Sequence, residues 1–224
     1  MPDTAPPTDP TIVCFGDSLT AGFQSPCQDN PMGRETPYGD ILQERLGRRV
    51  QVVISGVCGE LTGEMVMRLS RDALRHRPRV VVILGGTNDL GWNADVGEVM
   101  RNLVTLYERT SAVGAVPVPV TVPSIRLADA EGADHREVVA YLATHIGRRD
   151  QLNRLIRDYA ERKGLGLCDL FAATSDGESR QLAALYCNDG LHLSTAGYRR
   201  FADVLYDEVF SSRLDSWFPH TAHS

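Results

Sequence analysis

The sequence lacks the segments that would carry a chain into or across a membrane. No apolar run approaches the roughly 18 consecutive residues that a membrane-spanning helix needs. Residues 1–10 are rich in proline, aspartate and threonine, and they have neither the cationic start nor the apolar stretch of a secretory signal. We therefore expect a cytoplasmic protein without integral membrane association. A secreted mature form, trimmed of its signal, is the alternative that the sequence leaves open.

The cysteine patterns of a disulfide framework or a zinc site are also absent. The 5 cysteines are odd in number and scattered, and no Cys-x-x-Cys pair occurs. Cys14 and Cys168 lie in apolar runs, so we expect them to be small buried hydrophobic residues. The roles of Cys27, Cys58 and Cys187 stay open. No metal or cofactor is predicted.

Basic residues are outnumbered by acidic ones, and the motifs of nucleotide binding are absent. Lysine and arginine number 23 against 29 acidic residues, which gives a net charge of −6. Without a basic stripe to neutralise phosphates, we expect no nucleic-acid partner. Gly-x-Gly-x-x-Gly and the phosphate-binding loop Gly-x-x-x-x-Gly-Lys-Ser/Thr are missing, so a nucleotide has no support. Gly-x-Ser-x-Gly is missing too, which excludes the usual nucleophile turn of α/β-hydrolases.

The chain does contain apolar runs that alternate with amphipathic stretches. The runs are continuous rather than alternating, which favours parallel strands covered on both faces, and they occupy residues 11–15, 50–54, 80–84, 116–122 and 165–170. Pro117 and Pro119 cannot donate ladder hydrogen bonds, so we expect the fourth strand to be irregular. Apolar residues recur at helical spacing over 38–46, 60–77, 96–113, 136–162 and 194–210, with Ser194 as a helix cap.

This alternation predicts right-handed βαβ units and an α/β fold. The expected architecture is a three-layer α/β/α sandwich with about five parallel strands. One domain should span residues 11–210, with residues 1–10 and 211–224 as tails. Ligands of such sheets bind at the carboxyl ends of the strands, where several glycine-rich loops of this sequence are expected to converge.

Near these strand ends lie the parts that acyl transfer requires. Ser18 follows the first run, but a serine hydroxyl is a weak nucleophile until a base removes its proton. His192 is the candidate base, because among the 6 histidines it alone has a carboxylate three residues earlier. That carboxylate, Asp189, would fix the histidine tautomer and stabilise the imidazolium. Helix capping is the structural alternative for Ser18.

Gly59 and Asn88 are candidate donors to a tetrahedral oxyanion, with the N–H of Ser18 as a third. Such donors must be fixed in place before charge develops, and glycine lets a backbone N–H approach a substrate closely. Turn geometry alone is the alternative for Gly59, and local backbone capping is the alternative for Asn88. Asp17 should bind loop amides, and Asp89 should cap the next helix.

A two-carboxylate glycosidase that uses Asp17 and Asp189 is the rival chemistry. It leaves His192 and Asn88 without a function, so we disfavour it.

Together these segments resemble the conserved blocks of the SGNH (GDSL-type) hydrolase superfamily, over about residues 11–210. The blocks are Gly16-Asp17-Ser18-Leu19, Gly59 within Gly56-Val57-Cys58-Gly59-Glu60, Gly86-Thr87-Asn88-Asp89, and Asp189-Gly190-Leu191-His192. The resemblance implies a flavodoxin-like fold without a cofactor, Ser18 as nucleophile, Asp189 and His192 as its triad partners, and Gly59 and Asn88 as oxyanion donors. One departure is Ile54, which stands where many members carry a loop-stabilising asparagine.

We therefore expect a serine esterase that cleaves carboxylic esters through an acyl-enzyme on Ser18. The loops are too short for a large lipase lid, which favours short or medium acyl chains. Phe23, Trp92, Ile125 and Leu191 are candidates for the substrate cleft, with loop packing as their alternative. Acyl transfer, (lyso)phospholipase or carbohydrate deacetylase activity, and a catalytically silent ligand-binding module remain alternatives. The expected partner is a small-molecule ester substrate. The sequence leaves open whether the chain also forms a homo-oligomer.

Overall fold

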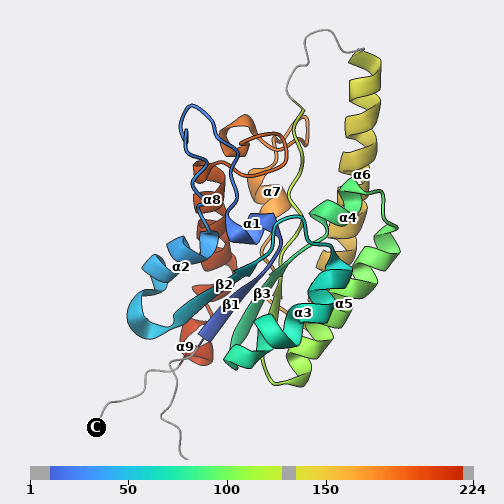
Figure 1. Ribbon diagram of the computed structural model, residues 1–224. Helices are drawn as coiled ribbons and strands as arrows, with labels where there is room; N and C mark the ends of the chain where they lie inside the picture. Colours follow the sequence, from blue (N-terminus) through green and yellow to red (C-terminus); the bar gives the residue numbers. More distant parts are fainter. Residues whose placement is uncertain (1–10, 128–134, 219–224) are drawn as a thin grey trace, which may run out of the picture.

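A parallel sheet between two layers of helices forms the centre of the computed structural model, which describes residues 11–127 and 135–218 (Figure 1). In these residues the sheet has four strands in the order β2-β1-β3-β4. They are β1 (Thr11–Gly16), β2 (Gln51–Gly56), β3 (Val80–Leu84) and β4 (Val116–Pro119), and every pairing is parallel. This order is the flavodoxin-like one, so the predicted fold class is confirmed.

The fifth predicted strand is reduced to a single parallel bridge between Val120 and Cys168. The N–H groups of Val116 and Val120 both donate on the β3 side, so alternate residues of this segment face β3. Pro117 and Pro119, which lie between them, therefore turn their nitrogens to the other neighbour, and proline has no N–H to donate. The two prolines therefore limit the hydrogen bonds between β4 and the segment around Cys168, which explains why the fifth strand is reduced to one bridge.

Alternate residues of the strands feed two separate cores, one on each face of the sheet. Ile12 and Cys14 of β1 belong to the core beneath α2 (Tyr38–Leu46) and α8 (Thr195–Leu205). Val13 and Phe15 belong to the core beneath α3 (Thr62–Asp72), α5 (Val96–Ala112) and α6 (His135–Lys163). Because both faces are covered, the central strands β1 and β3 are buried along their whole length, as their continuous apolar runs predicted, whereas the edge strand β2 is only partly buried.

Shorter elements connect these layers. They are α1 (Ser18–Ala21), η1 (Gly47–Arg49), η2 (Leu74–His76), α4 (Thr87–Gly91), α7 (Leu170–Thr174), η3 (Ala184–Tyr186), the π-helical turn η4 (Tyr206–Phe210) and α9 (Leu214–Trp217). Ser194 caps α8 as predicted, because its hydroxyl accepts from the Gly197 N–H at 3.2 Å. Among the helices of the described residues, none has the length and apolarity that crossing a membrane requires.

Residues 211–218, assigned to a tail from the sequence, pack on the domain instead. Phe218 is 1% exposed and belongs to the core beneath α8. The Nε of Arg49 donates to the Phe218 carbonyl at 3.1 Å, which ties this end of the chain to the turn before β2. Within the described residues, the packed part of the chain therefore extends past the predicted boundary at residue 210 to Phe218. The predicted tails at 1–10 and 219–224 lie outside the described residues.

Candidate active site

Three loops meet at the carboxyl edge of the sheet, at the top of Figure 1. Ser18 begins α1 directly after β1, Gly59 lies in the turn after β2, and Asn88 lies in α4 after β3. The Val57 N–H donates to the Gly16 carbonyl at 3.0 Å, which joins the first two loops. The Asn88 side-chain amide donates to the Glu60 carbonyl at 2.9 Å, which joins the second and third. Adjacent strands thus bring the three predicted segments together.

Ser18, His192 and Asp189 form a continuous chain of hydrogen bonds, which we call the Ser18–His192–Asp189 relay. Ser18 Oγ lies 3.1 Å from His192 Nε2. His192 Nδ1 lies 2.8 Å from Asp189 Oδ2. With the Nδ1 proton bound to the carboxylate, Nε2 is left to accept the hydroxyl proton of serine. Residues 174 positions apart in sequence are therefore in proton-transfer contact.

Asp189 is held as a carboxylate by several donors. Its Oδ1 accepts from the His192 N–H at 2.8 Å and the Leu191 N–H at 3.1 Å, and its Oδ2 accepts from the Ser25 hydroxyl at 2.6 Å. Burial alone would raise the pKa of Asp189. The hydrogen bonds from Ser25, His192 and Leu191 outweigh burial and hold this pKa well below its usual range. The carboxylate is therefore ionised at neutral pH.

Sequence reasoning missed Ser25. Asn188 positions it, because the Asn188 side chain accepts from the Ser25 N–H at 2.6 Å and donates to the Ser25 carbonyl at 3.1 Å. Nothing near residue 25 in the sequence indicates this contact, since its partners lie more than 160 positions away. Only the folded chain identifies it.

Phe23, predicted to line the substrate cleft, lies against the catalytic candidate histidine. The ring centroids of Phe23 and His192 are 4.6 Å apart at an interplanar angle of 58°. The Phe23 carbonyl accepts from the Tyr198 hydroxyl at 2.8 Å, which anchors this loop to α8. The contact limits how far the imidazole can rotate away from Ser18.

The predicted oxyanion donors lie on the three joined loops. Ser18 is the first residue of α1, so its N–H has no partner within the helix. Gly59 has a φ of +78°, and no atom lies within 4 Å of the place where its Cβ would be. One amide hydrogen of Asn88 is bound to Glu60, which orients the side chain and leaves the second hydrogen for a ligand.

Two carboxylates beneath the loops act as scaffolding. Asp17 caps α1, with Oδ1 accepting from the Leu19 N–H at 2.9 Å, as predicted. Burial, aided by the nearby charges of Asp89 and Glu60, raises the pKa of Asp17 to about 7. The prediction for Asp89 needs correction, because it does not cap the following helix. It accepts from the N–H and, at 2.7 Å, from the hydroxyl of Thr62, at the start of the preceding helix α3.

A buried ion pair supports the turn that carries Gly59, and sequence reasoning missed it. Arg68 of α3 binds Glu60 through two hydrogen bonds of 2.5 and 2.6 Å, with side chains 7% and 6% exposed. The same guanidinium donates to the carbonyls of Gly16 at 2.9 Å and Ser55 at 3.2 Å. Arg68 thus holds the turn after β2, where Ile54 replaces the asparagine of many similar sequences. The available signal was an arginine on the apolar face of α3, beside the buried Leu69.

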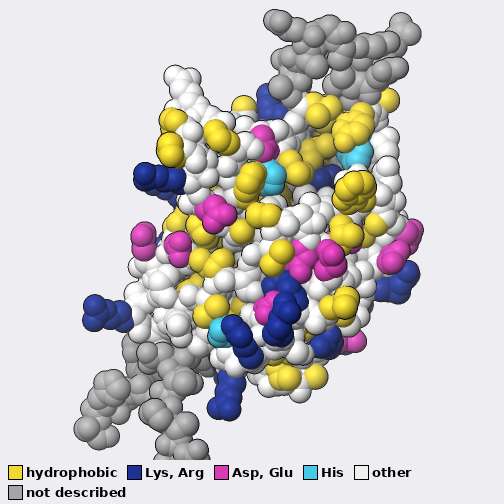
Figure 2. All heavy atoms as spheres, in the orientation of Figure 1, with side chains coloured by type: hydrophobic (Ala, Val, Ile, Leu, Met, Phe, Trp, Pro, Cys, Tyr) yellow, Lys and Arg dark blue, Asp and Glu magenta, His cyan; other side chains and the backbone are white. Residues whose placement is uncertain are grey.

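A cleft of about 430 Å³ opens beside Asn88 and Asp189. Three of the predicted pocket residues line it, namely Trp92, Ile125 and Leu191, whereas Phe23 is not part of its lining. In the space-filling view, hydrophobic and histidine side chains gather near α4 and α6 on the upper part of this face (Figure 2). Trp92 is 81% exposed and stands at the rim, whereas Ile125 is buried in the wall.

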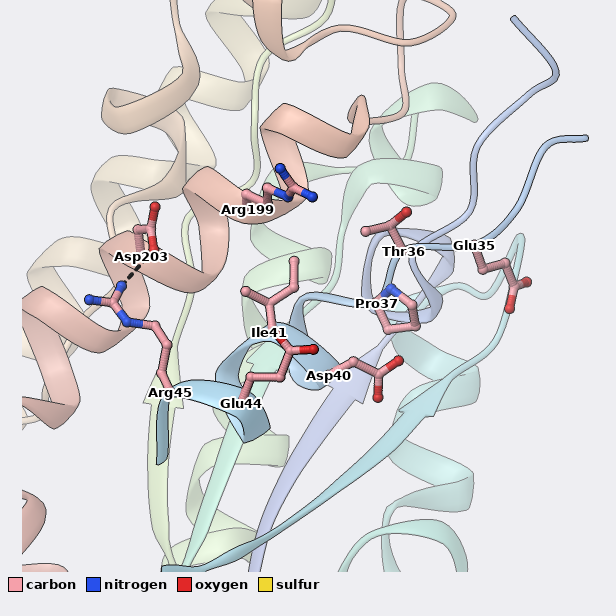
Figure 3. A pocket seen from close by; sticks show the side chains of 9 residues that line it. All are labelled: Glu35, Thr36, Pro37, Asp40, Ile41, Glu44, Arg45, Arg199 and Asp203. Atoms are coloured by element: carbon pink, nitrogen blue, oxygen red, sulfur yellow. Dashed lines mark hydrogen bonds and ion pairs between the residues drawn. The ribbon is translucent and has the colours of Figure 1, made fainter. Parts of the chain in front are cut away.

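A larger hollow of about 620 Å³ lies elsewhere, between α2, α8 and the loop before α2 (Figure 3). It is lined by charged residues, and Arg45 and Asp203 pair across it. None of the predicted site residues lines it, so we do not assign the chemistry to this hollow. Among the described residues, no group of three or more histidine, cysteine or acidic side chains is arranged to hold a metal ion.

A serine–histidine–aspartate relay at the carboxyl edge of a flavodoxin-like sheet is the arrangement expected of a hydrolase with a serine nucleophile. The model of the GDSL-like lipase/acylhydrolase family matches residues 14–200. The chain belongs to this family.

One relative by sequence and two solved structures are similar over most of their length. The Bacillus subtilis lipoprotein YqeF, itself uncharacterised, is 25% identical over 91% of this chain and 89% of its own. A lipase/acylhydrolase from Enterococcus faecalis superimposes with a TM-score of 0.70 at 24% identity, covering 91% of this chain and 96% of that one. The acetyl-xylooligosaccharide esterase Axe2 from Geobacillus, in a variant form, gives 0.67 at 20% identity, covering 89% and 93%.

Proposed function

We propose that the protein is a serine esterase that hydrolyses carboxylic esters of short or medium acyl chains. The observation that carries the proposal is the Ser18–His192–Asp189 relay, with distances of 3.1 and 2.8 Å, beside three donors on adjoining loops. Membership of a lipase/acylhydrolase family supports it. The cleft of about 430 Å³ suits a small substrate, since ligand sites commonly measure about 300–1,000 Å³.

In the proposed mechanism, Ser18 Oγ attacks the ester carbonyl while His192 Nε2 takes its proton. The oxyanion is stabilised by the N–H groups of Ser18 and Gly59 and by the Asn88 amide, each typically contributing about 2.7–4 kcal/mol. His192 then protonates the leaving alkoxide, which departs and leaves an acyl-enzyme. Water, deprotonated by the same imidazole, releases the acid and restores the serine. Asp189 stabilises the imidazolium in both steps.

The Ser18→Ala variant tests the proposal. We expect kcat for p-nitrophenyl acetate to fall by about a thousandfold or more, with an unchanged circular dichroism spectrum. Ser212→Ala, which alters an exposed serine just before α9, at the opposite end of the sheet from α1 and α4 (Figure 1), should keep wild-type turnover. A phosphonate fluoride should label Ser18, as read by mass spectrometry of the wild type. Activity that survives Ser18→Ala would refute the mechanism, and a wild type that neither turns over nor labels would indicate a silent binding module.

Two related activities are distinguished by the choice of substrate. Acyl transfer would form a new ester from a vinyl ester and an alcohol in water, instead of free acid. Carbohydrate deacetylation would release acetate from acetylated sugars, a test that the similarity to Axe2 suggests. A chain-length series of p-nitrophenyl esters should show a maximum at short or medium length. The predicted cytoplasmic location is open to cell fractionation.

A further inference from the structure

The cleft beside Asn88 contains a buried cation in its wall. Arg149 of α6 lines the cleft and is only 1% exposed. Its Nε donates to the Pro123 carbonyl at 3.2 Å, but its Nη1 has no hydrogen-bond partner among the residues that the structure describes. Nor do the ion pairs formed within residues 11–127 and 140–218 include Arg149. Burial lowers the pKa of Arg149 to about 10, so the guanidinium is charged at neutral pH.

Among the described residues that line the cleft, positive charge outweighs negative charge. Arg126 also lines it. His145 is 7% exposed and packs against the tilted ring of Tyr141, with ring centroids 4.1 Å apart. Burial and the neighbouring arginines lower the pKa of His145, so this imidazole is neutral at neutral pH. Among the described lining residues the one carboxylate is Asp189, which is bound to the Ser25 hydroxyl and the imidazole of the relay.

A buried charge without an ion-pair partner is unfavourable, because it has lost its hydration and no opposite charge replaces it. The cost is offset when a ligand of opposite charge enters. A guanidinium has a planar array of N–H donors that matches a carboxylate, so a carboxylate is the group that would satisfy Arg149 best. Trp92, Ile125 and Leu191 line the same cleft and offer apolar contact to a short methylene chain.

We propose that the cleft selects esters that carry a carboxylate, which pairs with Arg149 while the ester carbonyl lies between Ser18 and Asn88. The inference rests on the esterase function proposed above and names its substrate class. The carboxylate can belong to the acyl part, as in the monoester of a dicarboxylic acid, or to the alcohol part, as in an acylated hydroxy acid. A neutral ester fills the same space but leaves the guanidinium unpaired.

Two pairs of shape-matched substrates separate these sources. On the acyl side, p-nitrophenyl hydrogen adipate is compared with p-nitrophenyl 6-methylheptanoate, in which an isopropyl group replaces the carboxylate. On the alcohol side, acetate release from 6-acetoxyhexanoate is compared with release from 6-methylheptyl acetate. In one of the two pairs, kcat/KM of the wild type should be roughly tenfold to a hundredfold higher for the charged ester, as expected for a hydrogen-bonded charge.

The Arg149→Gln variant should abolish that preference, lowering kcat/KM for the charged ester much more than for its neutral match. Arg154→Gln is the matched control, because it removes the same charge from an exposed position on the same helix. It should retain the wild-type ratio. Retention of the preference in Arg149→Gln, or its loss in Arg154→Gln, would show that Arg149 does not recognise the carboxylate.

The wild type can overturn the inference even where Arg149→Gln fails to fold. If the charged ester is cleaved no faster than its neutral match in both pairs, the inference about Arg149 is overturned. Turnover of the neutral esters would still support the esterase function. A wild type that cleaves no ester at all, p-nitrophenyl acetate included, and is not labelled at Ser18, overturns both.

Discussion

Breaking the buried pair between Arg68 and Glu60 should destabilise the protein severely. Glu60→Gln keeps the shape of the side chain, but it leaves a guanidinium that is 7% exposed facing a neutral amide. Removing one partner of a buried pair costs about 3–5 kcal/mol. The carbonyls of Gly16 and Ser55 still accept from Arg68 at 2.9 and 3.2 Å, and Asp72 Oδ2 still lies 3.8 Å from Arg68 Nη1. We therefore expect the lower end, about 3 kcal/mol. For a chain of 224 residues this lowers Tm by roughly 6–12 °C.

Urea unfolding followed by circular dichroism measures the loss, by linear extrapolation at unchanged slope. The control is Arg71→Gln, which breaks an exposed pair with Asp72 on the same helix, where Arg71 is 74% exposed. Solvent screens such pairs, so this variant should unfold almost as the wild type does. Equal losses for Glu60→Gln and Arg71→Gln would refute the reasoning.

A double replacement tests whether the loss comes from the unpaired charge. When Glu60→Met is combined with Arg68→Met, no charge is left buried, and apolar residues of similar volume often replace such a pair at little cost. The double variant should therefore be more stable than the sum of the two single losses predicts. Additive losses would indicate that packing, and not charge, is responsible.

Three further predictions follow from single contacts. Ser25→Ala removes the 2.6 Å hydrogen bond to Asp189 and should lower kcat/KM for p-nitrophenyl acetate about tenfold. Ser25→Thr keeps a hydroxyl and should retain most of the wild-type kcat/KM. An unchanged kcat/KM in Ser25→Ala would contradict the positioning role. Asp17, with a pKa raised by burial from 3.8 to about 7, contributes stability at low pH that is lost as pH rises toward 7. Asp17→Asn should therefore be more stable than wild type at pH 8, by up to about 4 kcal/mol, and this difference should shrink toward pH 4. Urea unfolding at several pH values measures the difference. A stability gain that does not change with pH would contradict the raised pKa of Asp17. Gly16→Ala would place a Cβ 2.2 Å from a backbone carbonyl oxygen of β3 and should destabilise the protein by about 3 kcal/mol. Gly147→Ala, in open space on α6, should stabilise the protein by about 0.5–1 kcal/mol. Similar shifts in Tm for the two variants would be inconsistent with the packing.

The strands were predictable to the extent that their environment is uniform. β1 and β3 are buried on both faces, so their continuous apolar runs identify them without knowledge of their neighbours. At β4 the sequence indicated an irregular strand, but not the side on which Pro117 and Pro119 would interrupt the ladder. That side depends on register, which is a property of the pair of strands. The helix at 214–217 escaped prediction because its apolar residues, Leu214 and Trp217, pack on a core that forms only when the chain folds.

What the sequence determined by itself was the set of candidate catalytic groups: a serine after one strand, a glycine and an asparagine after two others, and an Asp-x-x-His segment further along the chain. These groups act through local geometry at strand ends and in turns, and short motifs record such geometry. Only the tertiary structure decided that Ser25 would bind Asp189, that Arg68 would be buried with Glu60, and that Arg149 would lie in the wall of the cleft. A charged or polar side chain carries no mark of its burial in the sequence, because its surroundings come from segments of the chain that meet only on folding.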